Sequence, residues 1–347
     1  MRTATLLVPV YAAAIVYASL QPFTDWRWPP DPLFSFLFAP WPRYVTTGDI
    51  LLNIAAYLPL GILLFMALRP PLSAMAAAGA ATLLGTALSF MLESTQMFLP
   101  TRIASNADLL LNGIGSGSGA CVAWAATRFP PLVRWQASQR GTLGDAGVIL
   151  ILSWIVMQAQ PAPFAFGVGD WRGALPFTPL FEHTPESYLR AEAAATALMT
   201  AAIGLMVESL SPARRGVWLP AGMIVLLGAL VKSLIAMPLA HAEHGLRWIT
   251  PGVALGFIAG VLIFALSARL PPRGRAVTAA LCVTGGLVIV NIAPENPYQT
   301  VFQFLLDPQF MNLASFSRLL HLLSAAWPLF ALAYLALHAR RGDGDRL

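Results

Sequence analysis

The chain has 347 residues, of which 57% are hydrophobic and only 11% are charged, and its net charge is +5. Soluble domains carry roughly 25% charged residues. The composition of this chain therefore excludes a water-soluble globular protein and predicts a polytopic membrane protein. The basic residues, nearly all of them arginines, are scattered between apolar runs. Because they form no contiguous basic stripe, we expect no nucleic-acid partner.

Ten apolar runs follow one another along the chain, each close to the roughly 20 residues that a membrane-spanning helix needs. They predict an all-α polytopic fold of about ten transmembrane helices. The first run is longer than the apolar part of a typical signal peptide and is followed by no clear cleavage site, so we interpret it as a retained signal-anchor helix. The predicted helices cover residues 4–20, 50–68, 73–95, 109–128, 147–165, 193–210, 217–237, 252–269, 276–293 and 319–338.

The connections between these runs differ in charge. Most arginines fall on one side of the predicted membrane, and positive charge favours the cytoplasmic side, so we expect both termini in the cytoplasm. The longer connections, 21–49, 166–192 and 294–318, then lie outside. Their tryptophan, phenylalanine and proline residues are typical of segments that lie at the membrane interface or re-enter the membrane.

Three pairs of polar residues lie where apolar runs of the first 130 residues begin or end. A spacing of three or four residues puts both members of a pair on one helix face, and the predicted orientation brings all three pairs to the extracytoplasmic edge of the membrane. Ionisable groups at that depth are costly and usually face a protein interior or a cavity, so these residues form a candidate ligand site. The candidate ligand-binding residues are Asp49 with Asn53, Glu93 with Gln96, Asp108 with Asn112, and Arg102 in the loop before the last pair.

Each of these polar residues also has a simpler structural interpretation. Asp49 and Asp108 could be N-cap carboxylates that satisfy free amides at the start of a helix. Glu93 could be hydrogen-bonded where helices meet, on a helix whose small residues pack against a neighbour. Arg102 could pair with one of the nearby carboxylates and fix its loop, or receive a phosphate through its planar fork.

Other residues with functional chemistry carry weaker signals. Cys121 and Cys282 lie inside apolar runs and are expected to pack as thiols. Lys232 could snorkel to the outer surface or pair with an acid. The group around His241 and His244 matches no metal-binding spacing, so the sequence predicts neither a metal nor a cofactor.

An internal repeat is suggested by shifting the chain by 143 residues without gaps, which lays the second to fourth predicted helices on the sixth to eighth. The shift places Asp49 on Glu192, whereas Glu93 falls on Ala236, so the second copy loses most of the polar set. Four helices per copy predict a parallel tandem repeat, followed by a C-terminal helix pair. The expected domains are residues 1–140, 141–272 and 273–347.

The first 130 positions contain the spaced residues Asp49-x3-Asn53-x5-Pro59-x-Gly61, Glu93-x2-Gln96, Arg102 and Asp108-x3-Asn112-x2-Gly115. This combination resembles the VanZ-like family of small bacterial membrane proteins, whose best known member is linked to low-level resistance to the glycopeptide teicoplanin. The resemblance implies a protein of the bacterial cytoplasmic membrane that acts in the cell envelope, with one intact and one degenerate copy. It implies no particular reaction.

Three functions are compatible with these features. The first is binding or translocation of an amphipathic envelope ligand, such as a lipid-linked saccharide, a cell-wall precursor or a phospholipid. The second is an integral-membrane enzyme that uses Glu93 or Asp108 as general acid or base on a glycan or lipid bond. The third is a structural membrane partner in which the polar residues only lock helices together. Membrane lipids are expected partners in each case, and the sequence does not fix the oligomeric state.

Overall fold

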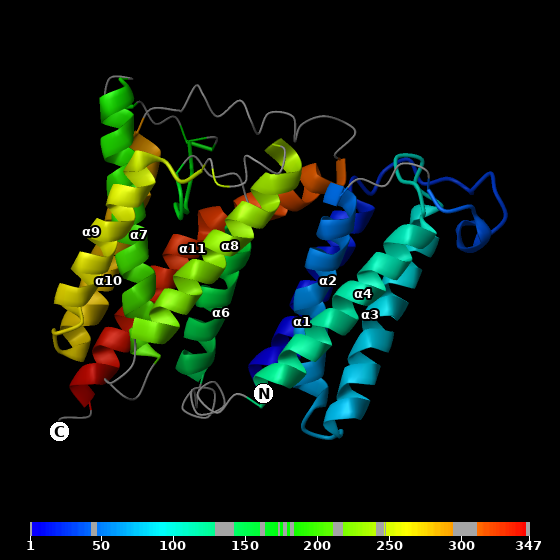
Figure 1. Ribbon diagram of the computed structural model, residues 1–347, viewed down its shortest axis with the longest axis horizontal. Helices are drawn as coiled ribbons and strands as arrows, with labels where there is room; N and C mark the ends of the chain where they lie inside the picture. The colour runs from blue at the N-terminus through cyan, green and yellow to red at the C-terminus, as the bar shows by residue number, and fades with distance from the viewer. Residues whose placement is uncertain are drawn as a thin grey trace. The chain divides into compact units, whose positions relative to one another are not determined.

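The computed structural model describes residues 2–42, 47–128, 142–159, 164–172, 174–175, 179–180, 184–210, 218–240, 246, 248–293 and 311–344. Within these residues the chain forms ten α-helices, one short 3-10 helix and no strand (Figure 1). The all-α prediction is confirmed, and each of the ten predicted apolar runs corresponds to a helix. The chain divides into two compact units, Met1–Gln136 and Ala137–Leu347, which are described separately below.

The first unit is built from four helices joined by one long and two short connections. The long connection, between the first two helices, contains the 3-10 helix. The elements are α1 (Arg2–Leu20), η1 (Ser35–Phe38), α2 (Thr47–Leu68), α3 (Ala74–Gln96) and α4 (Asn106–Ala126).

The closest helix contact of the first unit joins α2 and α4 through glycines. A Cβ atom on Gly115 would lie 2.5 Å from the carbonyl oxygen of Ile54, and one on Gly119 would overlap the carbonyl oxygen of Leu58. Small residues four apart let two helix backbones approach in this way. This contact therefore fixes how α2 and α4, and the polar residues at their ends, face each other.

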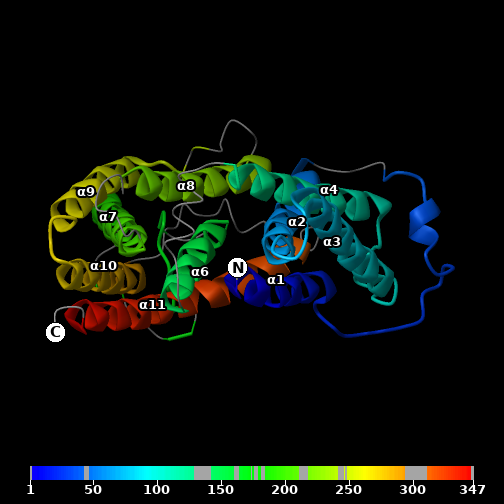
Figure 2. The same ribbon diagram turned by 90° about the horizontal axis from the view of Figure 1, so that it is seen from below.

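In its described residues the second unit contains six helices, of which α7 is central. Neighbouring helices pack around α7 (Figure 2), and almost all its side chains from Ala191 to Glu208 are buried. The C-terminal helices α10 and α11 belong to this unit, because α10 packs against α7 and α11 packs against α6 and α10. The helices are α6 (Thr142–Met157), α7 (Pro185–Ser209), α8 (Trp218–Ala240), α9 (Pro251–Ser267), α10 (Pro272–Ile292) and α11 (Met311–Gly344).

A glycine contact like that between α2 and α4 also joins α7 and α9. A Cβ on Gly256 would overlap the carbonyl oxygen of Ala193, and one on Gly260 would lie 2.6 Å from that of Ala197. Both units thus pair carbonyls four residues apart on one helix with glycines four apart on another. The matching positions differ by a few residues from those of the gapless 143-residue shift, so the tandem repeat stays a prediction.

Several helices are long and apolar enough to cross a membrane, as the composition predicts. Five meet both criteria by length and composition within the described residues, and five more are shorter apolar helices. Together with the composition, they identify a membrane protein. The five longer spans are Ala74–Gln96, Asn106–Ala126, Pro185–Ser209, Pro272–Ile292 and Leu320–Arg340.

Three predicted helix boundaries in the second unit are wrong by eight residues. Helix α11 begins at Met311, inside the predicted connection 294–318, and not near residue 319. Helix α6 ends at Met157 and not near residue 165, because prolines follow at positions 161 and 163 and proline cannot continue a helix. Helix α7 begins at Pro185, well before the predicted residue 193. Its first turns are polar, and Thr184 and Ser187 form a capping box that starts the helix without any apolar signal.

Candidate functional site

The predicted polar pairs converge at one end of the first unit. Helix α2 begins, α3 ends and α4 begins at this end (Figure 1). The carboxylates of Asp49, Glu93 and Asp108 consequently lie close enough to interact electrostatically. Asp49 is exposed on the first turn of α2, whereas Glu93 is only 4% exposed.

Glu93 joins the end of α3 to the start of α4. Its Oε2 atom accepts a hydrogen bond from the backbone amide of Ser105 at 2.8 Å. The hydroxyl of Ser105 in turn accepts hydrogen bonds from the amides of Ala107 at 3.2 Å and Asp108 at 3.4 Å. Ser105 is therefore the N-cap of α4, and the interpretation of Asp108 as the N-cap is wrong.

Asp108 instead connects α4 to α2. The amide nitrogen of Asn53 donates a hydrogen bond to Oδ1 of Asp108 at 3.0 Å. A carboxylate can only accept, so this contact also orients the Asn53 side chain. One predicted pair on α2 and one on α4 thus meet through a direct bond between the two helices.

A second polar layer lies one helical turn deeper. The amide nitrogen of Asn112 donates to the hydroxyl of Ser89 at 2.9 Å, and the hydroxyl of Tyr57 lies within hydrogen-bonding reach of Ser89. All three side chains are buried, and Oδ1 of Asn112 has no hydrogen-bond partner among the described residues. Further along α4, Ser116 donates to the carbonyl of Ala81 at 3.1 Å. A polar column therefore runs from the helix ends into the apolar interior.

Tyr57 belongs to this column, but the sequence interpretation did not include it. Its aromatic ring counts as apolar in a hydrophobic run, which hides the hydroxyl. Its position four residues after Asn53 places it on the same face of α2, and that spacing is the signal that could have identified it.

Gln96 and Arg102 have a different role from the other predicted residues, because they hold the end of α1. The side-chain amide of Gln96 donates to the carbonyl of Ser19 at 3.0 Å. The guanidinium of Arg102 donates to the carbonyls of Ala18 at 3.1 Å and Gln21 at 2.7 Å. These carbonyls have no intrahelical partner at a helix C-terminus. Burial lowers the pKa of Arg102 from its ordinary value. The predicted pairing of Arg102 with a carboxylate is wrong.

Replacing Arg102 by alanine is expected to lower the free energy of unfolding by about 1–3 kcal/mol, because it leaves the last carbonyls of α1 without donors. Arg102→Lys should recover only part of this loss, since lysine lacks the planar fork. Thermal unfolding of the purified protein in detergent measures both effects. Arg27→Ala is the matched control, because Arg27 is exposed and, among the described residues, only its backbone amide makes a hydrogen bond. Equal melting of the Arg102→Ala and Arg27→Ala variants would contradict this assignment.

The connection between α1 and α2 covers part of the site end. The backbone amide of Arg27 donates to the carbonyl of Phe98 at 2.9 Å, and the ring of Phe34 stacks on Phe90 of α3 at a centroid distance of 5.7 Å. The same connection exposes large aromatic side chains, including Trp28 at 75% and Phe38 at 88%. Aromatic residues at the end of a membrane helix are typical of the membrane interface.

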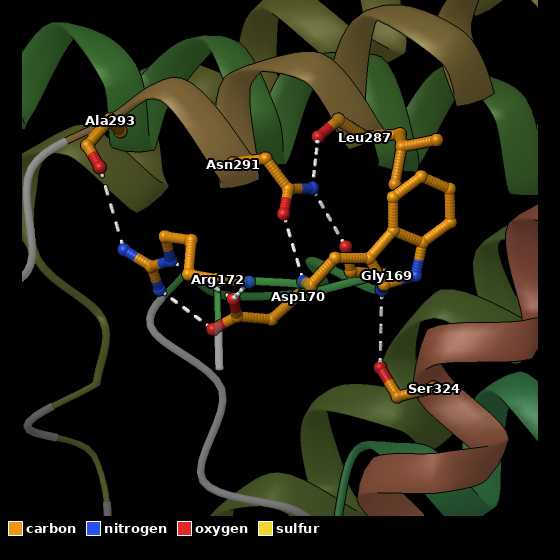
Figure 3. Close-up of polar contacts among 8 residues, drawn as sticks. Gly169, Asp170, Arg172, Leu287, Asn291, Ala293 and Ser324 are labelled. Atoms are coloured by element: carbon orange, nitrogen blue, oxygen red, sulfur yellow. Dashed lines mark hydrogen bonds and ion pairs between the residues drawn. The ribbon is translucent and has the colours of Figure 1, made fainter. Parts of the chain in front are cut away.

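The second unit contains a buried segment without helical structure that the sequence did not predict in this form. After α6, the side chains of Phe164, Phe166 and Val168 are buried. Figure 3 shows how Asn291 of α10 holds this segment, with its amide nitrogen donating to the carbonyl of Gly169 at 2.8 Å. Its Oδ1 accepts from the amide of Trp171, also at 2.8 Å. Irregular backbone inside a membrane protein needs such partners.

An ion pair closes this segment. Arg172 donates two hydrogen bonds to the carboxylate of Asp170, at 2.9 and 2.7 Å (Figure 3). Burial alone would raise the pKa of Asp170, but the hydrogen bonds and charge of Arg172, with a contribution from His321 of α11, hold that pKa below its ordinary value. Because the hydrogen-bonding groups of Asp170 and Arg172 are used mainly on each other, this ion pair is best explained as a contact that stabilises the fold of the segment.

Among the described residues, the remaining charged and thiol groups do not form a second cluster. Glu192 accepts a hydrogen bond from the hydroxyl of Thr250, joining α7 to α9. Lys232 is buried on α8, so its side chain does not extend to an exposed surface. Both cysteines are free thiols, and the described residues contain no group of side chains that could hold a metal ion. His241 and His244 lie outside the described residues.

Comparison with known proteins assigns a family to part of the chain. Residues 4–127 match the family model VanZ/LLP1. The match spans α1 to α4 and includes all seven predicted site residues, so the first unit carries a VanZ-like domain and the resemblance seen in the sequence is confirmed. The match does not extend to the second unit, and a degenerate second copy is not shown. Neither the search of curated proteins nor that of solved structures found a match.

Proposed function

We propose that this chain, whose residues 4–127 form a VanZ-like domain, is a multi-pass protein of the bacterial cytoplasmic membrane that binds an amphipathic envelope ligand. The ligand is a lipid-linked glycan or a phospholipid, and the protein presents it at the outer surface or helps to translocate it. Its role resembles that of glycopeptide-resistance proteins. The head group binds at the polar ends of α2, α3 and α4.

The incomplete pairing of the site carboxylates is the observation that carries this proposal. Glu93 and Asp108 each use one oxygen in a hydrogen bond to the protein, and the second oxygen accepts none among the described residues. Ionised or polar groups placed among apolar helices are costly unless they have partners. A ligand head group would supply the missing partners, and the apolar faces of the helices would accommodate its chain.

The distribution of arginines supports an outward-facing site. Over the whole chain most arginines fall on the predicted side opposite to the polar site, among them Arg2, Arg69 and Arg128 of the first unit, whereas Arg27 and Arg102 lie at the site end. Positive residues favour the cytoplasmic side of a membrane helix. This distribution favours an N-terminus in the cytoplasm and a site at the extracytoplasmic edge, and ten spanning helices would return the C-terminus to the cytoplasm.

Substitution of the two buried carboxylates by their amides tests the proposal. We expect Glu93→Gln and Asp108→Asn to leave membrane abundance within about twofold and to weaken ligand binding roughly tenfold or more, because a hydrogen bond to a charged group contributes about 1.5–3 kcal/mol. The measurements are immunoblotting of membranes and the teicoplanin susceptibility of a bacterial host that expresses each variant.

The matched control for these variants is Glu186→Gln. Glu186 is exposed and pairs only with Arg190 one turn later, so its amide should behave like the natural protein in both measurements. Normal abundance with lost resistance supports a binding site. Lost abundance for both amide variants would support the structural role, and unchanged resistance would remove the function assigned to Glu93 and Asp108.

A further inference from the structure

Hydrogen-bond donors and acceptors are unequally used in the site. Among the described residues, the side-chain amides and the guanidinium of the site each donate to a protein acceptor, and the backbone amide of Ser105 donates to Glu93. The side-chain hydrogen bonds run from Asn53 to Asp108, from Gln96 to Ser19, from Asn106 to Ala39, from Asn112 to Ser89, and from Arg102 to Ala18 and Gln21. The start of α4, which could otherwise attract an anion, is capped by Ser105.

The groups left over are acceptors. Oδ1 of Asn112 is buried and has no partner among the described residues, and Asn112 is only 5% exposed. It lies one turn below Asp108 on α4, and its amide faces Ser89, one turn below Glu93 on α3. The second carboxylate oxygens of Glu93 and Asp108 are likewise not engaged in the part of the chain that the structure describes. A buried acceptor without a donor costs about 1–3 kcal/mol, so this arrangement is suited to a ligand that brings donors.

The charge of the site points the same way. Three carboxylates, those of Asp49, Glu93 and Asp108, lie near one another, and the guanidinium of Arg102 faces the carbonyls at the end of α1. A phosphate group bound next to these carboxylates would meet like charges. An ammonium group carries a positive charge and three donors, and has no acceptor.

We infer that the VanZ-like domain recognises a primary ammonium group on its envelope ligand, through Glu93, Asp108 and the unpaired oxygen of Asn112. This inference rests on the proposed binding function and names the chemistry that the site selects. An aminophospholipid head group and an amino sugar of a lipid-linked saccharide both present this group. In either molecule the phosphate lies outside the carboxylate cluster.

Three probes with the same alkyl chain test the selection. The full-length protein in phosphatidylglycerol nanodiscs is titrated at pH 7 with dodecylammonium, dodecyl glucoside and dodecyl phosphate, and binding is followed by calorimetry. We expect saturable binding of dodecylammonium, at least about tenfold tighter than that of the glucoside, and no saturable binding of the phosphate. Competition by free ethanolamine or free glucosamine then distinguishes an aminophospholipid source from an amino-sugar source.

Variants connect any binding to the site. Glu93→Gln and Asn112→Leu should each weaken dodecylammonium binding roughly tenfold or more, whereas Glu186→Gln should not change it. Nanodisc incorporation and the melting temperature show whether each variant is folded. If Asn112→Leu fails to fold, Glu93→Gln provides the same test.

The outcomes separate this inference from the proposed function. Equal or tighter binding of dodecyl phosphate that depends on Glu93 would overturn the ammonium selection and leave a ligand site in place. Dodecylammonium binding that is unchanged in Glu93→Gln would assign the bound amine to the lipid surface and overturn the inference. If no probe binds and Glu93→Gln leaves teicoplanin susceptibility unchanged, both the inference and the proposed function are wrong.

Discussion

Replacing Gly119 by alanine is expected to lower the free energy of unfolding of the first unit by about 2–3 kcal/mol, because the added methyl group has no space. A Cβ at this position would overlap the carbonyl oxygen of Leu58 and would lie 3.0 Å from the amide nitrogen of Ile62. Both are backbone atoms of α2, which cannot move aside by a change of rotamer. The two helices would have to separate.

That separation would also reach the polar site. The contacts between α2 and α4 include the hydrogen bond from Asn53 to Asp108, which lies in the same interface nearer the helix ends. We therefore expect Gly119→Ala to reduce ligand binding as well as the melting temperature, although residue 119 itself is far along α4 from the carboxylates.

The control for this prediction is Gly79→Ala on α3. A Cβ there would have nothing within 4 Å, and alanine is favoured over glycine in a helix by roughly 1 kcal/mol. Gly79→Ala should therefore be neutral or slightly stabilising. Thermal unfolding in detergent compares the two variants, and equal melting temperatures would show that α2 and α4 do not approach through Gly119.

The positions of the helices could be predicted because a membrane imposes one simple requirement. About 20 apolar residues are needed for each span, and all ten apolar runs fold as helices. Predicted helix boundaries were wrong where a capping residue or a proline determines the end of the helix. The capping box at Thr184 starts α7 before its apolar region begins, and the prolines that follow Met157 end α6 within an apolar run.

The grouping of the polar residues at one end of the first unit was predicted more accurately than their contacts. Spacing places Asn53 and Asp108 at the same end of the helices, but spacing does not show which donor meets which acceptor. Arg102 illustrates this limit, because a carboxylate is its obvious partner in the sequence, whereas its partners in the structure are backbone carbonyls of α1. Backbone partners carry no residue signature, so a pattern of side-chain types cannot identify them.

The buried segment of the second unit shows the same limit more strongly. Its residues from Phe164 to Val168 are apolar, and the first two were included in the predicted helix 147–165 although two prolines precede them. The segment is distinguished by the side chain of Asn291, which is distant in sequence and makes hydrogen bonds to the backbone amide of Trp171 and the backbone carbonyl of Gly169. Asn291 itself lies at the end of an apolar run and was not singled out, because one asparagine near a helix end usually has a local role.

Replacing Asn291 by alanine is consequently expected to destabilise the second unit by about 2–6 kcal/mol, since two backbone groups would lose their partners at about 1–3 kcal/mol each. The groups are the carbonyl of Gly169 and the amide of Trp171, and the asparagine that serves them is 4% exposed. Water has little access to replace these hydrogen bonds.

Two further variants show whether hydrogen bonding is the cause. Asn291→Asp keeps an acceptor for the amide of Trp171 but directs a carboxylate at the carbonyls of Gly169 and Leu287, to which the natural amide donates. It should therefore be at least as unstable as Asn291→Ala. Asn106→Ala is the control, because the half-buried Asn106 makes one side-chain hydrogen bond, to the carbonyl of the exposed Ala39. Its loss should change the free energy of unfolding by no more than about 0.5 kcal/mol.

Hydrogen exchange provides the most direct measurement. In the natural protein the amides of Gly169 and Trp171 donate to Ser324 and Asn291, so both should exchange slowly. In Asn291→Ala the amide of Trp171 should exchange much faster, together with a lower melting temperature of the whole protein. Slow exchange at Trp171 with an unchanged melting temperature would mean that Asn291 does not hold the segment, and that burial of Phe164 and Phe166 is sufficient to keep it between the helices.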